Sequence, residues 1–151
     1  MQSSATLNTL LEQAEAERDA QAAVLRQCEA AAAQARQQIE QLNAYRAQYQ
    51  QRWTSQFRQA GAIELVQCYQ GFSQRLDQAI TMQNQVTTQA EARVQQARAA
   101  LVAHEQRVAA VRKLIERRRA EQQRLADRRE QRSTDEAAQR RSTSGLTPSL
   151  I

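Results

Sequence analysis

Residues that interrupt a helix are nearly absent from this chain. Its 151 residues include three glycines and one proline, and only Gly61 lies between two long segments with helical periodicity. Because a sheet of several strands needs many turn residues, a β-sandwich or barrel is excluded. The chain also lacks runs rich in Val and Ile and a glycine-rich phosphate loop, which excludes a doubly wound α/β enzyme.

The apolar residues are mostly too small to fill a globular core. Of the 62 residues in the hydrophobic class, 28 are alanine, which leaves 34 larger side chains. Aromatic residues make up 4% of the chain and charged residues 25%. This balance is typical of long helices and coiled coils.

Two segments show the spacing of three and four residues that predicts amphipathic helices. The first apolar stripe runs from Leu7 to Trp53, and the second is a nearly unbroken heptad pattern from Leu76 to Ile115. Glycine readily ends a helix, so Gly61 marks a turn between them. The sequence therefore predicts an all-α fold, two long helices in an antiparallel coiled-coil hairpin, with helix 2 longer than helix 1.

The expected boundaries follow from the same pattern. A single hairpin domain covers residues 1–141 and comprises helix 1 (about 5–58), a turn (about 59–63) and helix 2 (about 64–140). The residues from 142 to 151 contain Ser, Thr, Gly145 and Pro148, and they are expected to form a disordered tail.

A turn near Gly61 also sets the register, because facing residues then have numbers that add to about 121. Tyr49 is expected opposite Phe72, and Trp53 opposite Tyr69. The N-terminal end of helix 1, near residue 5, lies opposite residue 117, so residues 117–140 of helix 2 are expected to be unpaired. Helix propensity and local pairs of Glu121 with Arg117 and Arg124 would stabilise that segment. Cys28 and Cys68 would lie ~40 Å apart, too far for a disulfide.

The positive charge is confined to the C-terminal half. The net charge of the chain is +5, and residues 112–132 alone hold nine basic and four acidic side chains. The segment fits a solvated helix face or a docking element for an acidic protein surface. A contact with nucleic acid is a weaker interpretation, since no aromatic residue is interleaved for base stacking.

All six aromatic residues fall within a window of 28 residues around the turn. They either fill the wider end of the hairpin or remain at the surface as anchors for a partner, where Tyr and Trp are favoured. The two interpretations are compatible, because some rings can be buried while others are exposed. The window comprises Tyr45, Tyr49, Trp53, Phe57, Tyr69 and Phe72.

Nothing in the sequence indicates catalysis, a metal site or a cofactor. His104 is the only histidine, the two cysteines have no neighbouring ligands, and a thin hairpin offers no concave pocket. No stretch approaches the ~20 apolar residues that span a bilayer, and the N-terminus lacks the pattern of a signal peptide. We therefore expect a cytoplasmic, non-enzymatic protein.

Three short segments are more particular than the helical periodicity. They are the run LLEQAEAE from Leu10, then Gln38, Leu42, Tyr45 and Tyr49 before the turn, and Phe72, Leu76, Ala79 and Ile80 after it. In these residues the chain resembles the FliJ family of the bacterial flagellar type III export apparatus, and the likeness covers most of its length. The size, the turn position and the basic C-terminal helix all agree with that family.

The resemblance implies a central stalk that has no enzymatic activity and serves protein export and motility. In the family, the end with both termini is thought to sit in the hexameric ring of the export ATPase, while a patch near the turn contacts the membrane-embedded export gate protein. Family members are also described as escorts for export chaperones. The stalk would thus be peripheral at the cytoplasmic face of the inner membrane when bound.

Two sets of residues follow from this resemblance. Position 83 departs from the family pattern, which often has histidine where this chain has Gln83. The gate-binding patch would comprise Gln38, Leu42, Tyr45, Tyr49, Phe72, Leu76 and Ala79. The ATPase-binding end would comprise Leu7, Leu11, Arg112, Arg117, Arg118, Arg119 and Arg124.

Three alternatives remain at this point. The chain could be the equivalent stalk of a virulence type III secretion system. It could be a basic coiled coil that binds nucleic acid, with binding that weakens steeply as salt rises. It could also be a structural coiled coil that assembles with itself.

Overall fold

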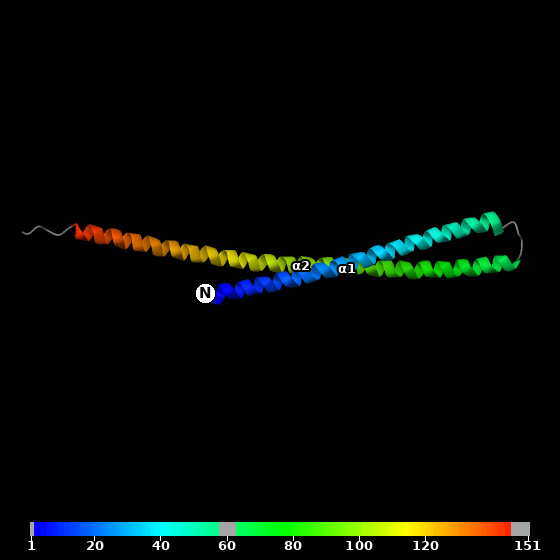
Figure 1. Ribbon diagram of the computed structural model, residues 1–151, viewed down its shortest axis with the longest axis horizontal. Helices are drawn as coiled ribbons and strands as arrows, with labels where there is room; N and C mark the ends of the chain where they lie inside the picture. The colour runs from blue at the N-terminus through cyan, green and yellow to red at the C-terminus, as the bar shows by residue number, and fades with distance from the viewer. Residues whose placement is uncertain (1, 58–62, 146–151) are drawn as a thin grey trace, which may run out of the picture. The chain divides into compact units, whose positions relative to one another are not determined.

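The computed structural model describes residues 2–57 and 63–145, and nearly all of them are helical (Figure 1). The first helix, α1 (Gln2–Arg52), continues directly into a five-residue π-helix, η1 (Trp53–Phe57). The second, α2 (Ile63–Ser144), is much longer. No strand occurs in the described part of the chain. The predicted all-α hairpin with a longer second helix is confirmed.

The ends of the helices differ from the expected boundaries. Most of the expected turn, residues 59–62, lies outside the described residues, and Ile63 already belongs to α2. The segment 142–144, expected in the disordered tail, is helical instead. The hydroxyl groups of Ser142 and Ser144 donate to backbone oxygens three residues earlier, at 2.8 and 3.0 Å. Each hydroxyl group is thus bonded to the preceding turn of the same helix. The rest of that tail, 146–151, lies outside the described residues.

The chain divides into two units that we describe separately. The loop-side unit, Ala16–Glu105, pairs one segment of α1 with the antiparallel first half of α2. Its core is narrow, because half of its fully buried side chains are alanine methyl groups, which bury little area per layer. The buried core residues are Ala32, Ala35, Leu76, Ile80, Val94 and Ala97.

The terminal unit combines residues 1–15 with residues 106–151. Ala14, Val108 and Val111 are its buried residues, spaced on α2 as the heptad pattern predicts. Glu15 accepts a hydrogen bond from Arg112 Nη2 at 3.0 Å across the two helices. This unit therefore has a small core and a polar contact beside it.

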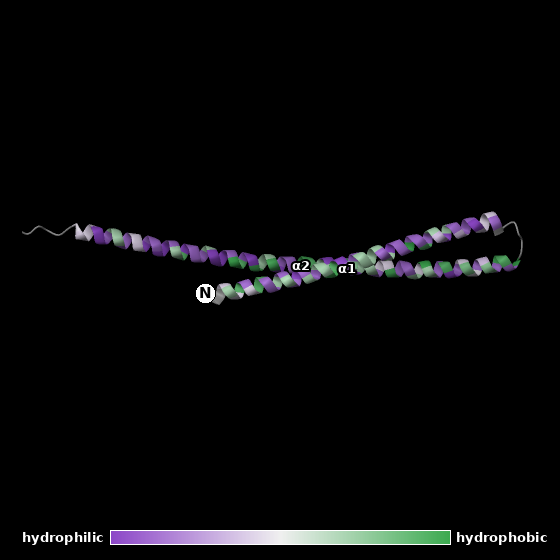
Figure 2. Ribbon diagram, viewed as in Figure 1, coloured by the Kyte–Doolittle hydropathy of each residue, from purple (hydrophilic) through white to green (hydrophobic). Residues whose placement is uncertain are grey.

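Beyond this core, α2 continues as a segment that we call the C-terminal arm, residues 116–144. Every residue of the arm is exposed, and its colouring in Figure 2 is mostly hydrophilic. The expected pairs of Glu121 with Arg117 and Arg124 are not formed among the described residues, so that prediction was wrong. Ion pairs between solvated side chains contribute little free energy, which explains why the sequence spacing alone does not enforce them.

Candidate functional site

Five aromatic rings form a connected cluster on the loop-side unit. Tyr49 is central, with ring centroids 4.5 Å from Phe72, 5.4 Å from Tyr69 and 6.5 Å from Tyr45. Trp53 stacks on Tyr69 at 4.2 Å, with the ring planes 12° apart. The Tyr49–Phe72 and Trp53–Tyr69 contacts are the facing pairs that the register predicts. The side chain of Phe57 lies outside the described residues.

The cluster has a covered side and an open side. Tyr49, Trp53, Tyr69 and Phe72 are half-buried, whereas Tyr45 is 48% exposed. The ring centroids of Tyr45 and Phe72 lie 6.1 Å apart in an edge-to-face arrangement, which aromatic pairs prefer. The rings thus pack together at this end of the hairpin and leave Tyr45 open to solvent. A role of these rings as anchors for a partner stays a prediction.

The other four residues of the expected patch differ in accessibility. Gln38 is exposed, Leu42 and Ala79 are half-buried, and Leu76 is 7% exposed. A side chain so fully covered has little surface left for a partner. Leu76 therefore belongs to the core that supports the patch, a distinction that the heptad pattern alone does not make.

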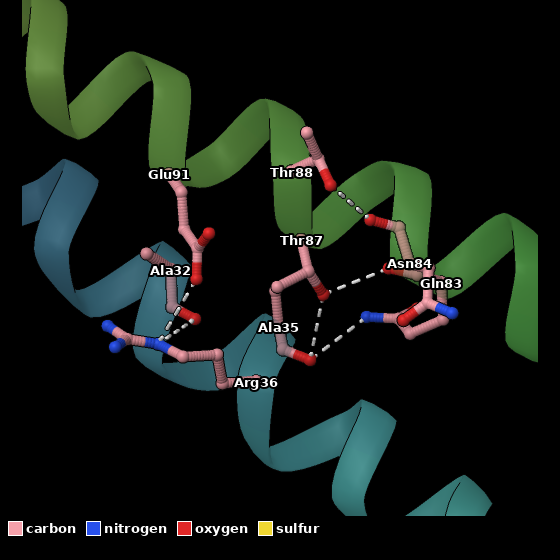
Figure 3. Close-up of polar contacts among 8 residues, drawn as sticks. All are labelled: Ala32, Ala35, Arg36, Gln83, Asn84, Thr87, Thr88 and Glu91. Carbon is pink, nitrogen blue, oxygen red and sulfur yellow. Dashed lines mark hydrogen bonds and ion pairs between the residues drawn. The ribbon is translucent and has the colours of Figure 1, made fainter.

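Polar contacts tie the two helices together beside the patch (Figure 3). Gln83 Nε2 donates to the backbone oxygen of Ala35 at 3.3 Å. It also donates to Gln38 Oε1 at 3.0 Å. The Thr87 hydroxyl lies 3.4 Å from the same Ala35 oxygen and 2.9 Å from the oxygen of Gln83. We call the contacts of Gln83 and Thr87 with the backbone oxygen of Ala35 the carbonyl clamp. The sequence analysis did not predict these contacts, although a polar residue at a heptad interface position, Gln83, could have indicated them.

Ion pairs flank these contacts along the loop-side unit. Arg46 lies 3.4 Å from Asp77, and Arg98 lies 3.6 Å from Glu29. Arg36 approaches Glu91 at 4.0 Å and also donates from Nε to the oxygen of Ala32 at 3.4 Å. All six side chains are at least 40% exposed. Solvent screening therefore limits each pair to a small stabilisation.

The expected ATPase-binding residues fall into two groups. Leu7 and Leu11 are half-buried in the terminal unit, and Arg112 is joined to Glu15, so these three contribute to its packing. Four arginines of the C-terminal arm are exposed and form no ion pair among the described residues. These are Arg117, Arg118, Arg119 and Arg124.

No other chemistry is assembled in the described parts of the chain. They contain no group of three or more His, Cys, Asp or Glu side chains that could hold a metal ion. His104 is half-buried, and Cys28 and Cys68 are both free thiols. Among the described helices, none is long and apolar enough to cross a membrane.

A family comparison bears on the alternatives left open by the residues. The family model described as flagellar FliJ protein matches residues 3–145. The chain belongs to the FliJ family. Membership of this family implies a component of the flagellar export apparatus that takes part in protein transport. No curated protein and no solved structure gave a significant match to the chain.

As a FliJ protein, the chain presents its candidate contact residues in two places. The aromatic cluster lies in the loop-side unit, and the exposed arginines lie in the C-terminal arm of the terminal unit. The FliJ family is one of non-enzymatic export components. The flagellar match also favours that apparatus over the virulence system.

Proposed function

We propose that this protein is a central stalk of the flagellar export apparatus that contacts the export gate protein through the loop-side unit. The observation that carries the proposal is the open side of the aromatic cluster, where Tyr45 is 48% exposed while its ring rests on Phe72. A tyrosine ring that already packs on a neighbouring ring loses little freedom when a partner binds, which suits it to anchor an interface. Gln38, Leu42, Tyr49, Phe72 and Ala79 would surround it, with Leu76 beneath.

The test is the affinity of the full chain for the cytoplasmic part of the export gate protein. We expect Tyr45→Ala to weaken binding about tenfold or more, the effect typical of a central tyrosine in an interface. Val102→Ala is the matched control, because Val102 is 50% exposed on the same unit but lies outside the patch. Equal affinities of the two variants would overturn the gate assignment, provided that circular dichroism shows the same helix content for both.

We further propose that the terminal unit engages the hexameric export ATPase through the arginines of the C-terminal arm. Arginine guanidinium groups can bind carboxylates in bidentate geometry, and these are exposed. Removing residues 117–151 should abolish binding or stimulation of the ATPase while gate binding persists. Unchanged binding to the ATPase by the shortened chain would contradict the role of the arm.

The same stalk would work in the cytoplasm, peripheral to the inner membrane, and would escort export chaperones. A pull-down from the native cytosol should recover the hexameric ATPase and export chaperones together with the protein. Recovery of nucleic acid in a complex that weakens steeply with salt would instead support a basic nucleic-acid-binding coiled coil. A stable self-assembled species in sedimentation, with neither partner recovered, would support a purely structural coiled coil.

A further inference from the structure

The expected gate-binding patch is built from both helices, so its shape depends on how α1 is placed lengthwise against α2. Gln38, Tyr45 and Tyr49 come from α1, and Phe72 and Ala79 come from α2. A slide of one residue moves one half by about 1.5 Å along the axis and turns its side chains by about 100°. Something beside the patch must therefore fix the register.

The apolar core next to the patch defines the register weakly. On α1, the fully buried positions there are Ala32 and Ala35, at 1% and 5% exposure. A methyl group offers little shape for a neighbour to interlock with, whereas larger side chains interdigitate and resist sliding. Leu76 and Ile80 on α2 are buried, at 7% and 6% exposure, and hydrogen bonds between the helices add directional contacts to the register that these side chains define.

The carbonyl clamp supplies such contacts. The Ala35 oxygen accepts a hydrogen bond from Gln83 Nε2 at 3.3 Å. The Thr87 hydroxyl lies 3.4 Å from the same oxygen and shares its single hydrogen between that oxygen and the closer oxygen of Gln83, at 2.9 Å. Gln83 and Thr87 lie about one turn apart on α2, so a shift of the carbonyl by about 1.5 Å along the axis in either direction would lengthen at least one of the two contacts. The clamp therefore opposes sliding in either direction.

Gln83 also reaches into the patch itself. Its Nε2 lies 3.0 Å from Gln38 Oε1, and with the bond to Ala35 both hydrogens of that amide nitrogen are used inside the hairpin. Gln83 is half-buried, whereas Gln38 is exposed. The inner amide thus orients the outer one, which leaves the Nε2 of Gln38 free to turn toward solvent.

We propose that Gln83, assisted by Thr87, is a positioning residue of the gate-binding patch. It holds the two halves of the patch in register and orients Gln38, and it acts through these residues and not by contact with the gate protein. The effect of Gln83 on binding rests on the proposed gate-binding function. The register itself can be measured without any partner.

The first experiment measures the register in the free full-length chain. Spin labels at positions 34 and 89, which are exposed on different helices, report one distance distribution when Cys28 and Cys68 are replaced by alanine. We expect Gln83→Leu combined with Thr87→Val to broaden or shift that distribution. Thr88→Val is the matched control, since Thr88 donates only to the oxygen of Asn84 on its own helix. An unchanged distribution in the combined variant would overturn the register role.

The second experiment measures affinity for the cytoplasmic part of the gate protein. Gln83→Leu should weaken binding about five- to tenfold, the effect of losing one or two net hydrogen bonds, whereas Gln85→Leu, an exposed neighbour, should not. If Gln83 acts mainly by orienting Gln38, the variant with both Gln83→Leu and Gln38→Ala should bind no more weakly than the weaker single variant. Additive losses together with an unchanged distance distribution would overturn the proposal, because neither Gln38 nor the register would then transmit the effect of Gln83. A wild-type chain without gate affinity would refute the proposed function and leave the distance result intact.

Discussion

The loop-side unit and the C-terminal arm share the same helix, α2, but it is stabilised differently in each. In the loop-side unit, α2 packs Leu76, Ile80 and Val94 into a core and carries rings and amides that contact α1. In the arm, no side chain is buried and Leu125, its one large apolar residue, is 53% exposed. Contacts with α1 therefore stabilise α2 in the loop-side unit, whereas only interactions within the helix stabilise it in the arm.

This difference shows that helical secondary structure alone does not tell whether a segment unfolds together with the rest of the protein. Isolated helices in water are held by propensity and local contacts, and they open in small steps. Packed helices open together, because each layer supports the next. Substitutions in the two regions should consequently differ in size and in the kind of change they produce.

The largest expected effect comes from the core of the loop-side unit. Ile80→Ala should lower the free energy of unfolding by about 2–5 kcal/mol, because it removes a buried side chain and leaves a cavity. Leu125→Ala in the arm should change it by less than about 0.5 kcal/mol. Thermal melting followed by circular dichroism compares the two. Similar losses would mean that the arm is packed as well.

The next effect concerns the ring pairs that only the loop-side unit has. Trp53 and Tyr69 stack at 4.2 Å, and such pairs contribute about 0.5–1.5 kcal/mol beyond the area they bury. A double-mutant cycle with Trp53→Ala and Tyr69→Ala should therefore give a coupling energy in that range. A coupling energy near zero would show that the stack does not stabilise this end of the hairpin in solution.

A matched pair of glycine substitutions separates cooperative from local stability. Ala92 and Ala126 are both exposed on α2, one in the loop-side unit and one in the arm. Each change to glycine costs about 1 kcal/mol of helix propensity. Ala92→Gly should lower the global unfolding free energy, whereas Ala126→Gly should only speed amide hydrogen exchange within the arm. A lowered melting midpoint for Ala126→Gly would contradict the comparison.

The smallest expected effect concerns the ion pair of the terminal unit. Glu15→Gln removes the negative charge that pairs with Arg112, and solvent-accessible ion pairs contribute about 0.2–1 kcal/mol. The loss should be measurable by denaturant unfolding at low salt and should shrink toward zero at high salt, where charges are screened. Glu121→Gln, in the arm, is the control and should leave stability unchanged at both salt concentrations.

The facing pairs were predictable, whereas the accessibility of each patch residue was not. Tyr49 with Phe72 and Trp53 with Tyr69 followed from one break in two long periodic segments, because that break leaves a single register. The burial of Leu76 did not follow, since a heptad position places a residue at the interface without saying how much a neighbour covers it. The π-helix at the end of the first helix was not predicted either, because apolar periodicity does not distinguish it from an α-helical turn.

By itself, the sequence determined the fold class, the antiparallel pairing, the longer second helix and the concentration of aromatic and basic residues in different segments. These depend on periodicity, on the scarcity of breakers and on composition, all of which are local properties of the chain. Only the tertiary structure decided that Tyr45 is open while Leu76 is covered, that Arg112 meets Glu15, and that Gln83 and Thr87 meet one carbonyl of the other helix. Such contacts require two helices to be placed to within about an ångström, and hydrogen bonds form only at that precision.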